Sequence, residues 1–182
     1  MKNLVYLYGS PSAGKSTTAA SVYTSAKKFG LVTGLVYEVA SSYIEKGESL
    51  PKPAQLMREQ LDLELQKMRS CNFVVSDSPP IIGYYYASTA EERCTLKAMM
   101  DEHSELVRDL GFTVDCFYLT RITKYSDANR LHSEQESDNI SKELIHHVME
   151  NNPEDYSLTL VPKRIPIEFR DSYILSKIGL FK

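Results

Sequence analysis

The sequence predicts an α/β fold of three layers, in which a five-stranded, mostly parallel sheet lies between two layers of helices. Short apolar runs alternate with helical patterns along the 182-residue chain, and this alternation is typical of parallel sheets that are covered on both faces. The first apolar run leads into GSPSAGKS at residues 9–16, which fits the phosphate-binding pattern G-x-x-x-x-G-K-[ST]. Because such folds bind ligands at the carboxyl ends of their strands, we expect the functional site at that edge.

The phosphate loop is the most specific motif in the chain. Its expected binding residues are Gly9, Ser10, Pro11, Ser12, Ala13, Gly14, Lys15, Ser16 and Thr17. Glycines let the backbone approach a phosphate, and N–H groups at a helix N-terminus attract anions. We expect Lys15 to reach the β- and γ-phosphates of ATP and Ser16 to hold Mg²⁺. The alternative is an ordinary strand-to-helix turn, but the apolar strand before the loop and the helical pattern after it favour nucleotide binding.

Composition narrows the class of protein. The net charge of −3 and the pI of about 5.8 argue against a general nucleic-acid-binding surface, although a local basic patch stays open. The three cysteines lack metal-ligand spacing, which favours free thiols in a reducing cytosol. Residues 1–3 leave no room for a signal peptide before the first strand, and no apolar run reaches membrane-spanning length. We therefore expect one cytoplasmic domain over residues 1–182 that does not enter a membrane.

The first half of the chain is expected to add two strands to the first one. Residues 33–38 and 73–77 are apolar runs that each end in an acidic residue. Between them, a short helix should end at Gly47 and a longer one should begin at Pro53. Two prolines and a glycine in residues 78–86 argue against a regular helix at the start of that segment.

The second half of the chain contains two capping-box patterns, Thr89 with Glu92 and Ser133 with Glu136. Each pattern predicts the start of a helix. The first of these helices carries His103 on its apolar stripe, where a packed core histidine is the favoured interpretation over a ligand. The remaining predicted elements are strands over residues 114–119 and 158–161 and a helix within residues 162–182. Residues 121–132 are polar and basic without apolar periodicity, so a loop is predicted there.

Glu38 and Asp77 stand at the ends of the second and third predicted strands. If the third strand lies beside the first, the Asp77 carboxylate falls near Ser16 and can bind Mg²⁺; the alternative is a helix-capping aspartate. Glu38 is the candidate general base that deprotonates an acceptor hydroxyl, and the alternative is a surface carboxylate. Asp77 is also a candidate base, and the sequence leaves these two assignments open.

A basic loop around residues 121–133 is a candidate lid. It contains Arg121, Lys124 and Arg130, and cations of this kind stabilise the charge that develops during phosphoryl transfer. A closing segment also excludes water, which protects ATP from hydrolysis. Arg130 is the strongest candidate of the three. The alternative is a solvated basic loop whose charge is balanced by the acidic residues of the next helix.

Aromatic side chains offer a candidate acceptor pocket. Tyr84, Tyr85 and Tyr86, together with Tyr43 and the Pro79-Pro80 pair, could stack on a base or ring of an acceptor. Plain core packing is the alternative for the same residues, and the sequence does not separate the two.

Four segments, taken in order, resemble bacteriophage-type P-loop ATPase/kinase proteins, which are similar to ribosylnicotinamide kinase domains and deoxynucleoside kinases. These segments are GSPSAGKST at 9–17, VYEVA at 36–40, SDSP at 76–79 with YYYA at 84–87, and NRLHSE at 129–134. The resemblance implies a nucleotide-kinase-like fold with strand order 2-3-1-4-5, Glu38 and Asp77 near the acceptor, and Arg130 in a lid. It also implies host cytoplasm as the location if the chain is phage-encoded.

The chain departs from that family at two places. Asn129 stands where a glycine commonly precedes the lid arginine, and Ser41 and Ser42 stand where an arginine often follows the Glu-x-Ala segment. The second departure removes the expected contact with an acceptor phosphate.

The leading functional hypothesis is an ATP- and Mg²⁺-dependent phosphotransferase. Its acceptor would be a hydroxyl or phosphate of a nucleoside, nucleotide or related small molecule. One alternative is a kinase of hydroxymethyl-pyrimidine in phage DNA, for which the only hint is the group Lys163, Arg164, Arg170 and Lys177. The other is a P-loop ATPase that acts as a switch or binds a partner. No N-K-x-D element is present, which argues against a GTPase, and the oligomeric state is left open.

Overall fold

The five strands form one fully parallel sheet in the order β2-β3-β1-β4-β5, which confirms the predicted fold class and strand order. The computed structural model describes residues 2–122 and 133–180. The strands are β1 (Lys2–Tyr8), β2 (Thr33–Val36), β3 (Phe73–Ser76), β4 (Phe112–Tyr118) and β5 (Ser157–Leu160). Because β1 lies at the centre, between β3 and β4, its carboxyl end presents the phosphate loop in the middle of the sheet edge.

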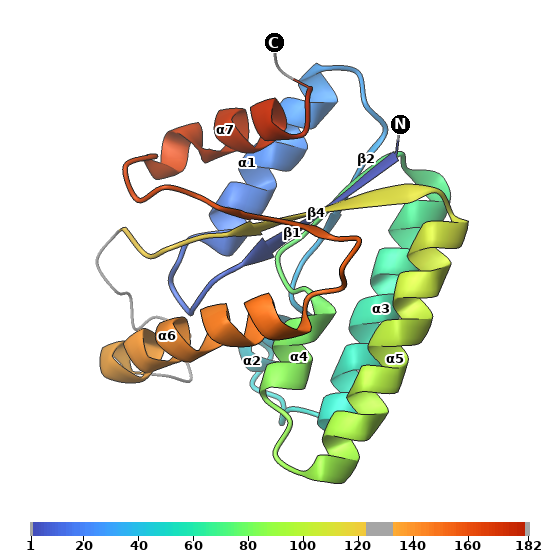
Figure 1. The fold of residues 1–182 in the computed structure, drawn as a ribbon, viewed down its shortest axis with the longest axis vertical. Helices are drawn as coiled ribbons and strands as arrows, with labels where there is room; N and C mark the ends of the chain where they lie inside the picture. Colours follow the sequence, from blue (N-terminus) through green and yellow to red (C-terminus); the bar gives the residue numbers. More distant parts are fainter. Residues whose placement is uncertain (1, 123–132, 181–182) are drawn as a thin grey trace.

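Helices cover both faces of the sheet (Figure 1). They are α1 (Lys15–Lys28), α2 (Val39–Glu45), α3 (Pro53–Ser70), α4 (Pro80–Tyr85), α5 (Ala90–Asp109), α6 (Glu134–Asn151) and α7 (Arg170–Lys177). A 3₁₀ turn, Ile167–Phe169, precedes α7. Helices α1 and α7 lie together on one face, and α3, α4, α5 and α6 lie on the other.

Two apolar cores result from the alternation of side chains along the strands. Leu4, Tyr6 and Tyr8 of β1 face the core beneath α3 to α6, whereas Val5 and Leu7 face the core beneath α1 and α7. All five are essentially inaccessible to solvent. This burial on both faces is the reason why the strand reads as a continuous apolar run rather than an alternating one.

The second strand is shorter than predicted. It ends at Val36 rather than at Glu38, because the Asp77 N–H donates to the Val36 carbonyl (3.2 Å) and the parallel ladder stops there. Tyr37 is half exposed, and Glu38 becomes the N-cap residue of α2. Glu38 therefore lies just beyond the sheet, above its edge, instead of within it.

The prediction that residues 78–86 would not begin as a regular helix holds for residues 78 and 79, but a helix that was not predicted starts at Pro80. Pro80 occupies the first turn of α4, where a missing N–H costs nothing and the fixed φ suits a helix. Ile81 and Ile82 of this short helix are buried against the core. The burial of these two side chains explains why a helix of six residues is held here.

The two predicted helix starts differ in detail. Ser133 and Glu136 form a complete capping box, as predicted. Thr89 accepts a hydrogen bond from the Glu92 N–H (3.1 Å), but the Glu92 carboxylate bonds the backbone N–H of Ser88 (2.9 Å) instead of closing the box on Thr89. Both helices start where the sequence predicts.

A polar network lies inside the larger core. The carboxylate of Glu64, which is fully buried, accepts hydrogen bonds from Tyr6 (2.7 Å) and Ser76 (2.6 Å). The Nε2 atom of His103 lies 3.0 Å from the same carboxylate, and His103 is 3% exposed. His103 is therefore a packed core residue, as predicted. Within the described residues, no helix is both long enough and apolar enough to cross a membrane.

Candidate active site

The phosphate loop joins the carboxyl end of β1 to the start of α1. The backbone turns through positive φ angles at Gly9 (148°), Ser12 (61°) and Gly14 (84°), and Gly14 is the N-cap residue of the helix. The Ala13 N–H donates to the Ser10 carbonyl (3.1 Å), which closes the turn. This strand–turn–helix setting is the one that the motif requires, with the N-terminus of a 14-residue helix directed at the loop.

The two glycines of the motif are required because the atoms packed behind the loop leave no room for a Cβ. A Cβ on Gly9 would lie 2.5 Å from the carbonyl oxygen of Leu119, and a Cβ on Gly14 would lie 2.7 Å from Cδ1 of Ile167. Both glycines also have positive φ, which L side chains rarely adopt. The sequence reasoning assigned these glycines to the approach of a phosphate, whereas the steric demand in this structure comes from neighbouring backbone and side chains.

Lys15 folds over the loop that precedes it. Its Nζ atom donates to the carbonyl oxygens of Gly9 (2.9 Å) and Ser10 (3.4 Å). Ser16 and Thr17 follow in the first turn of α1, where both are exposed at the sheet edge. The ammonium and the exposed polar side chains therefore surround the N-terminus of one helix, a combination suited to phosphate groups.

Asp77 lies beside this turn because β3 is the neighbour of β1. The carboxyl is 2% exposed, and burial raises its pKa, while a hydrogen bond from Ser16 and the nearby Lys15 ammonium act in the opposite direction. The Oδ1 atom is buried without a hydrogen-bond partner among the described residues. A buried carboxylate oxygen with unused acceptor capacity beside a serine hydroxyl fits a Mg²⁺ ion, which takes one or two protein ligands together with phosphate oxygens and water.

Glu38 lies next to Asp77. Its backbone N–H hydrogen-bonds the Asp77 carboxyl, and its charge adds to the rise in the pKa of Asp77. The Oε2 atom of Glu38 accepts a hydrogen bond from Ser41 (2.7 Å), one turn into α2. The structure thus brings Lys15, Ser16, Glu38 and Asp77 together at one sheet edge. Sequence reasoning did not find the contact with Ser41, although an i, i+3 serine after a helix cap is a recognisable signal.

Of the three cations in the predicted lid, the structure describes Arg121. Arg121, just after β4, pairs with Glu134 (3.3 Å) and with Asp138, both on α6. This contact matches the alternative in which acidic residues of the next helix balance the basic loop. Lys124 and Arg130 lie outside the described residues. Helix α6 is also attached to the phosphate loop, because the Ser137 hydroxyl donates to the Pro11 carbonyl (2.9 Å).

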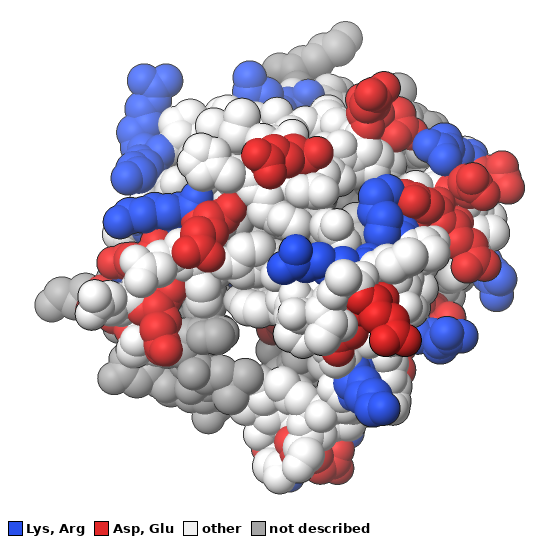
Figure 2. Space-filling view, turned by 60° about the horizontal axis from the view of Figure 1, so that its bottom comes forward, with Lys and Arg blue, Asp and Glu red and all other residues white. Residues whose placement is uncertain are grey.

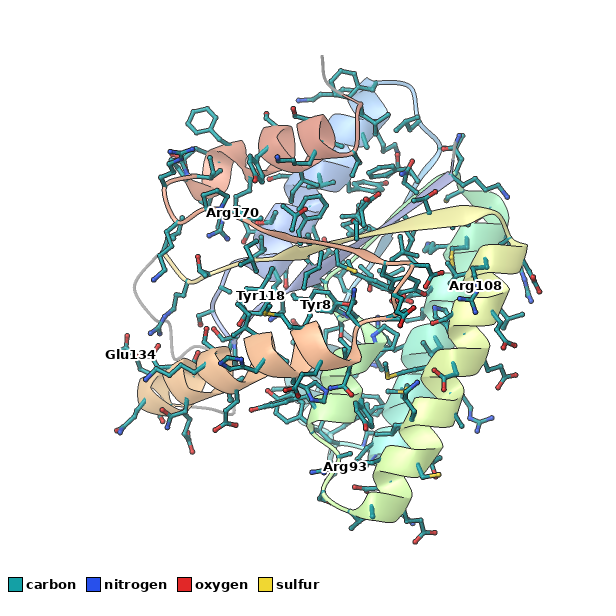
Figure 3. All side chains as sticks on the ribbon, in the orientation of Figure 1. Tyr8, Arg93, Arg108, Tyr118, Glu134 and Arg170 are labelled. Atoms are coloured by element: carbon teal, nitrogen blue, oxygen red, sulfur yellow. The ribbon has the colours of Figure 1, made fainter. Side chains whose placement is uncertain are left out.

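Arg170, at the start of α7, supports the phosphate loop from behind. Its guanidinium donates to the carbonyls of Ala13 (2.7 Å) and Thr120 (2.8 Å), and the residue is 1% exposed. Figure 3 shows this side chain between α7 and the end of β4. Burial lowers the pKa of Arg170. The sequence signal that could have found this role is the i, i+4 spacing to Ile174, which puts Arg170 on the buried stripe of α7.

The burial of Arg170 corrects the idea of a cationic groove formed by the C-terminal basic residues. Lys163, Arg164 and Lys177 are exposed, but Arg170 is occupied by backbone carbonyls and faces the interior. On the face seen in Figure 2, acidic and basic side chains of the described residues are interspersed. The described residues of that face therefore offer no broad positive surface to a polymer of phosphates.

A cleft of about 720 Å³ lies between α4 and α6. Its lining includes Tyr84, Tyr85, Tyr86, Arg93, Glu143 and His147. The tyrosine run thus lines an open space, while Tyr84 and Tyr85 also pack against the larger core, so both alternatives describe part of what these residues do. Tyr43 makes a different contact, because its hydroxyl donates to Glu59 (3.0 Å).

Comparisons with known proteins agree with this geometry. A family model described as AAA domain matches residues 4–164. Deoxyadenosine kinase of M. mycoides with bound dATP has a TM-score of 0.59 to this chain at 17% identity, and the alignment covers 97% of this chain and 99% of that one. The APS kinase of Mycobacterium tuberculosis in complex with AMPPNP and APS has a TM-score of 0.51 at 11% identity, with 97% of each chain covered. At these identities the likeness is one of fold. None of the curated proteins matches the chain.

Proposed function

The chain belongs to the AAA domain family, and from that premise we propose that it is an ATP- and Mg²⁺-dependent phosphotransferase with a small-molecule acceptor. The observation that carries this proposal is the buried Asp77 carboxyl beside Ser16, whose Oδ1 atom has no partner among the described residues and which has a second carboxylate, that of Glu38, nearby. The first carboxylate would serve Mg²⁺ binding in a kinase and in a hydrolytic switch alike. The second supplies a base for an acceptor.

ATP would be held by the backbone N–H groups at the start of α1 and by Lys15. The ammonium would exchange its contacts with the loop carbonyls for phosphate oxygens, to which it is attracted more strongly because they are charged. Ser16 and Asp77 would hold Mg²⁺, which when bound neutralises charge on the β- and γ-phosphates. Ionised Asp77 is required for that task.

Glu38 is our assignment for the general base. Its backbone N–H hydrogen-bonds the Asp77 carboxyl, and its charge contributes to the raised pKa of Tyr86, which lines the cleft. The Glu38 carboxylate would take the proton of an acceptor hydroxyl. The acceptor oxygen would then form a bond to the γ-phosphorus as the bond to the β-phosphate oxygen breaks, so that ADP leaves with the electron pair.

The test is transfer of label from γ-labelled ATP with Mg²⁺ to a panel of nucleosides, nucleotides, sugars and hydroxymethyl-pyrimidine DNA. We expect label in a small acceptor, and no label with Lys15→Ala, whose circular dichroism should match that of the parent. Free phosphate as the sole product, whatever acceptor is present, would contradict the transfer function and favour the ATPase alternative. Label in DNA would favour the alternative in which the protein is a kinase of hydroxymethyl-pyrimidine in DNA.

A further inference from the structure

We infer that the cleft between α4 and α6 is the acceptor site and that its acceptor is an alcohol with a flat aromatic ring and no phosphate of its own, as in a nucleoside. This inference rests on the proposed phosphotransferase function. It is carried by the position of the cleft relative to Glu38, by the rings that line it, and by the sign of the charges around it.

The cleft opens next to the reacting groups. Tyr86 lines it, and burial together with the nearby Glu38 carboxylate raises the pKa of Tyr86 to about 12. The opposite wall is α6, which is attached to the phosphate loop by the hydrogen bond from Ser137 to Pro11. The cleft therefore lies near the candidate base through Tyr86, and near the loop that would hold ATP through Glu136, the neighbour of Ser137. A hydroxyl on a molecule bound here can approach the γ-phosphate from the cleft side.

Ring-shaped side chains gather on both walls. His147 on α6 lies 5.2 Å from the ring of Tyr84 and 5.4 Å from that of Tyr85, which are on α4. Burial, together with the nearby Arg93, lowers the pKa of His147, so the imidazole is neutral near pH 7. Because these rings already touch one another, a flat ligand ring would stack on their exposed faces, with a gain of about 1–3 kcal/mol for each stacked base. The volume of about 720 Å³ is within the range for small-molecule sites.

The charges of the lining disfavour an acceptor that is already phosphorylated. The described lining residues include two carboxylates, Glu136 and Glu143, and one cation, Arg93. Tyr85 donates a hydrogen bond to Glu143 (2.8 Å), which keeps that carboxylate on the cleft wall. Arg93 lies near the start of α5, at the outer part of the molecule in Figure 3. A phosphate dianion bound among these groups would be close to two like charges, with Arg93 as the one cation among the described lining residues.

The carboxylates and tyrosine hydroxyls suit a neutral ring instead. Glu143 can accept from an exocyclic amino group or a hydroxyl, and Asn139 and Asn151 on the same wall can both donate and accept. Such groups recognise the edge of a base or the hydroxyls of a sugar.

The experiment is calorimetry of the full chain with AMPPNP and Mg²⁺, titrated with matched pairs of nucleosides and their 5′-monophosphates. Binding of at least one nucleoside at least about tenfold more tightly than its monophosphate is the expected result, a ratio that corresponds to about 1.4 kcal/mol. Equal or tighter binding of the monophosphates would overturn the inference that the charges of the cleft disfavour a phosphorylated acceptor. Transfer of label to an acceptor without an aromatic ring would overturn the inference that the acceptor carries such a ring.

Variants locate the site. Tyr84→Leu should weaken nucleoside binding about tenfold, whereas Tyr23→Leu, the same change on α1 away from the cleft, should leave it unchanged. Glu143→Gln retains an acceptor for Tyr85 and removes the charge, so it should narrow the gap between nucleoside and monophosphate. If Glu143→Gln leaves the ratio of nucleoside to monophosphate affinity unchanged, the charge argument is contradicted, and this result does not depend on whether Tyr84→Leu folds. Nucleoside binding without any transfer of label would overturn the phosphotransferase function alone and leave the ring site standing.

Discussion

Asp77 unites deep burial with an acceptor oxygen that no described group uses. Both properties follow from the chain path, because β3 is enclosed between β1 and β2 and ends one residue before this aspartate. Hydrogen bonds from Ser16 and from the Glu38 N–H satisfy part of the carboxyl. A group held in this way is preorganised for a cation and is costly to leave without one.

Replacing Asp77 by Asn should separate ATP binding from its dependence on Mg²⁺. The amide keeps the size of the side chain but removes the negative charge that a divalent ion needs. We expect turnover to fall about a hundredfold or more, with ATP binding in the absence of Mg²⁺ changed much less. Calorimetric titration of ATP with and without Mg²⁺ measures the difference. An equal Mg²⁺ effect in the variant and the parent would show that the ion binds elsewhere.

The raised pKa of Asp77 predicts a pH dependence with a definite sign. Burial favours the protonated form, so this carboxyl takes up its proton at a higher pH than an ordinary aspartate does. Mg²⁺-dependent ATP binding should therefore weaken as the pH falls, beginning above the ordinary aspartate range. For the ligand-free chain the same shift acts in the opposite sense, and the contribution of Asp77 to stability decreases as the pH rises through the raised pKa.

Binding titrations and denaturation at a series of pH values check this prediction. In Asp77→Asn, the part of each pH profile that arises from Asp77 should be absent. A Mg²⁺ effect in the parent that stays constant down to the pKa of a free aspartate would contradict it.

Among the elements, α7 contributes most unexpectedly to the candidate site. It packs on α1 in the smaller core through Ile174 and Leu175, and its first residue, Arg170, joins the phosphate loop to the end of β4. The neighbouring Asp171 accepts a hydrogen bond from Ser25 of α1 (2.6 Å). One short helix thus holds both the loop and the helix that follows it.

Arg170→Met should destabilise the fold and weaken ATP binding together. Methionine fills much of the same space but leaves the carbonyls of Ala13 and Thr120 without their donors. We expect the free energy of unfolding to fall by about 3 kcal/mol and the KM for ATP to rise more than kcat falls. Arg164→Met, an exposed position six residues earlier, is the matched control and should change neither quantity. Normal ATP affinity in a folded Arg170→Met variant would contradict the support role.

The elements that could be predicted from sequence are those with a local signal. Apolar runs located the strands, and the capping box at Ser133 located the start of α6. The strand-end positions of Asp77 and Glu38 brought both to the correct edge. Helix α4 was missed because proline is read as a helix breaker although it is favoured in the first turn. The support role of Arg170 was missed because its spacing to Ile174 signals burial, whereas its partners are backbone carbonyls, which leave no trace in side-chain identity.

At the scale of the whole molecule, the sheet connects distant parts of the chain. The central strand β1 pairs with β3 and β4, and Arg170 reaches back to Ala13 across most of the sequence. The buried Glu64 joins Tyr6 of β1, Ser76 of β3 and His103 of α5 inside one core. Elements connected in this way are expected to lose their structure together.

We predict a single cooperative unfolding transition for the chain, as expected of one domain. Far-ultraviolet circular dichroism and tyrosine fluorescence should give the same midpoint, and the fluorescence signal is usable because the chain has 12 tyrosines and no tryptophan. ATP with Mg²⁺ at one hundred times its Kd should raise the free energy of unfolding by about 2.7 kcal/mol. Two separated transitions would instead indicate two folding units.

The buried contact between Arg170 and the phosphate loop has a consequence for the order in which the protein matures during translation. The loop at residues 9–16 is synthesised before the arginine that supports it, which follows all five strands in the chain. Nascent chains that stop short of α7 would have the complete motif but lack its support. The ability to bind ATP would therefore be acquired late, and it would mark chains whose sheet is already assembled.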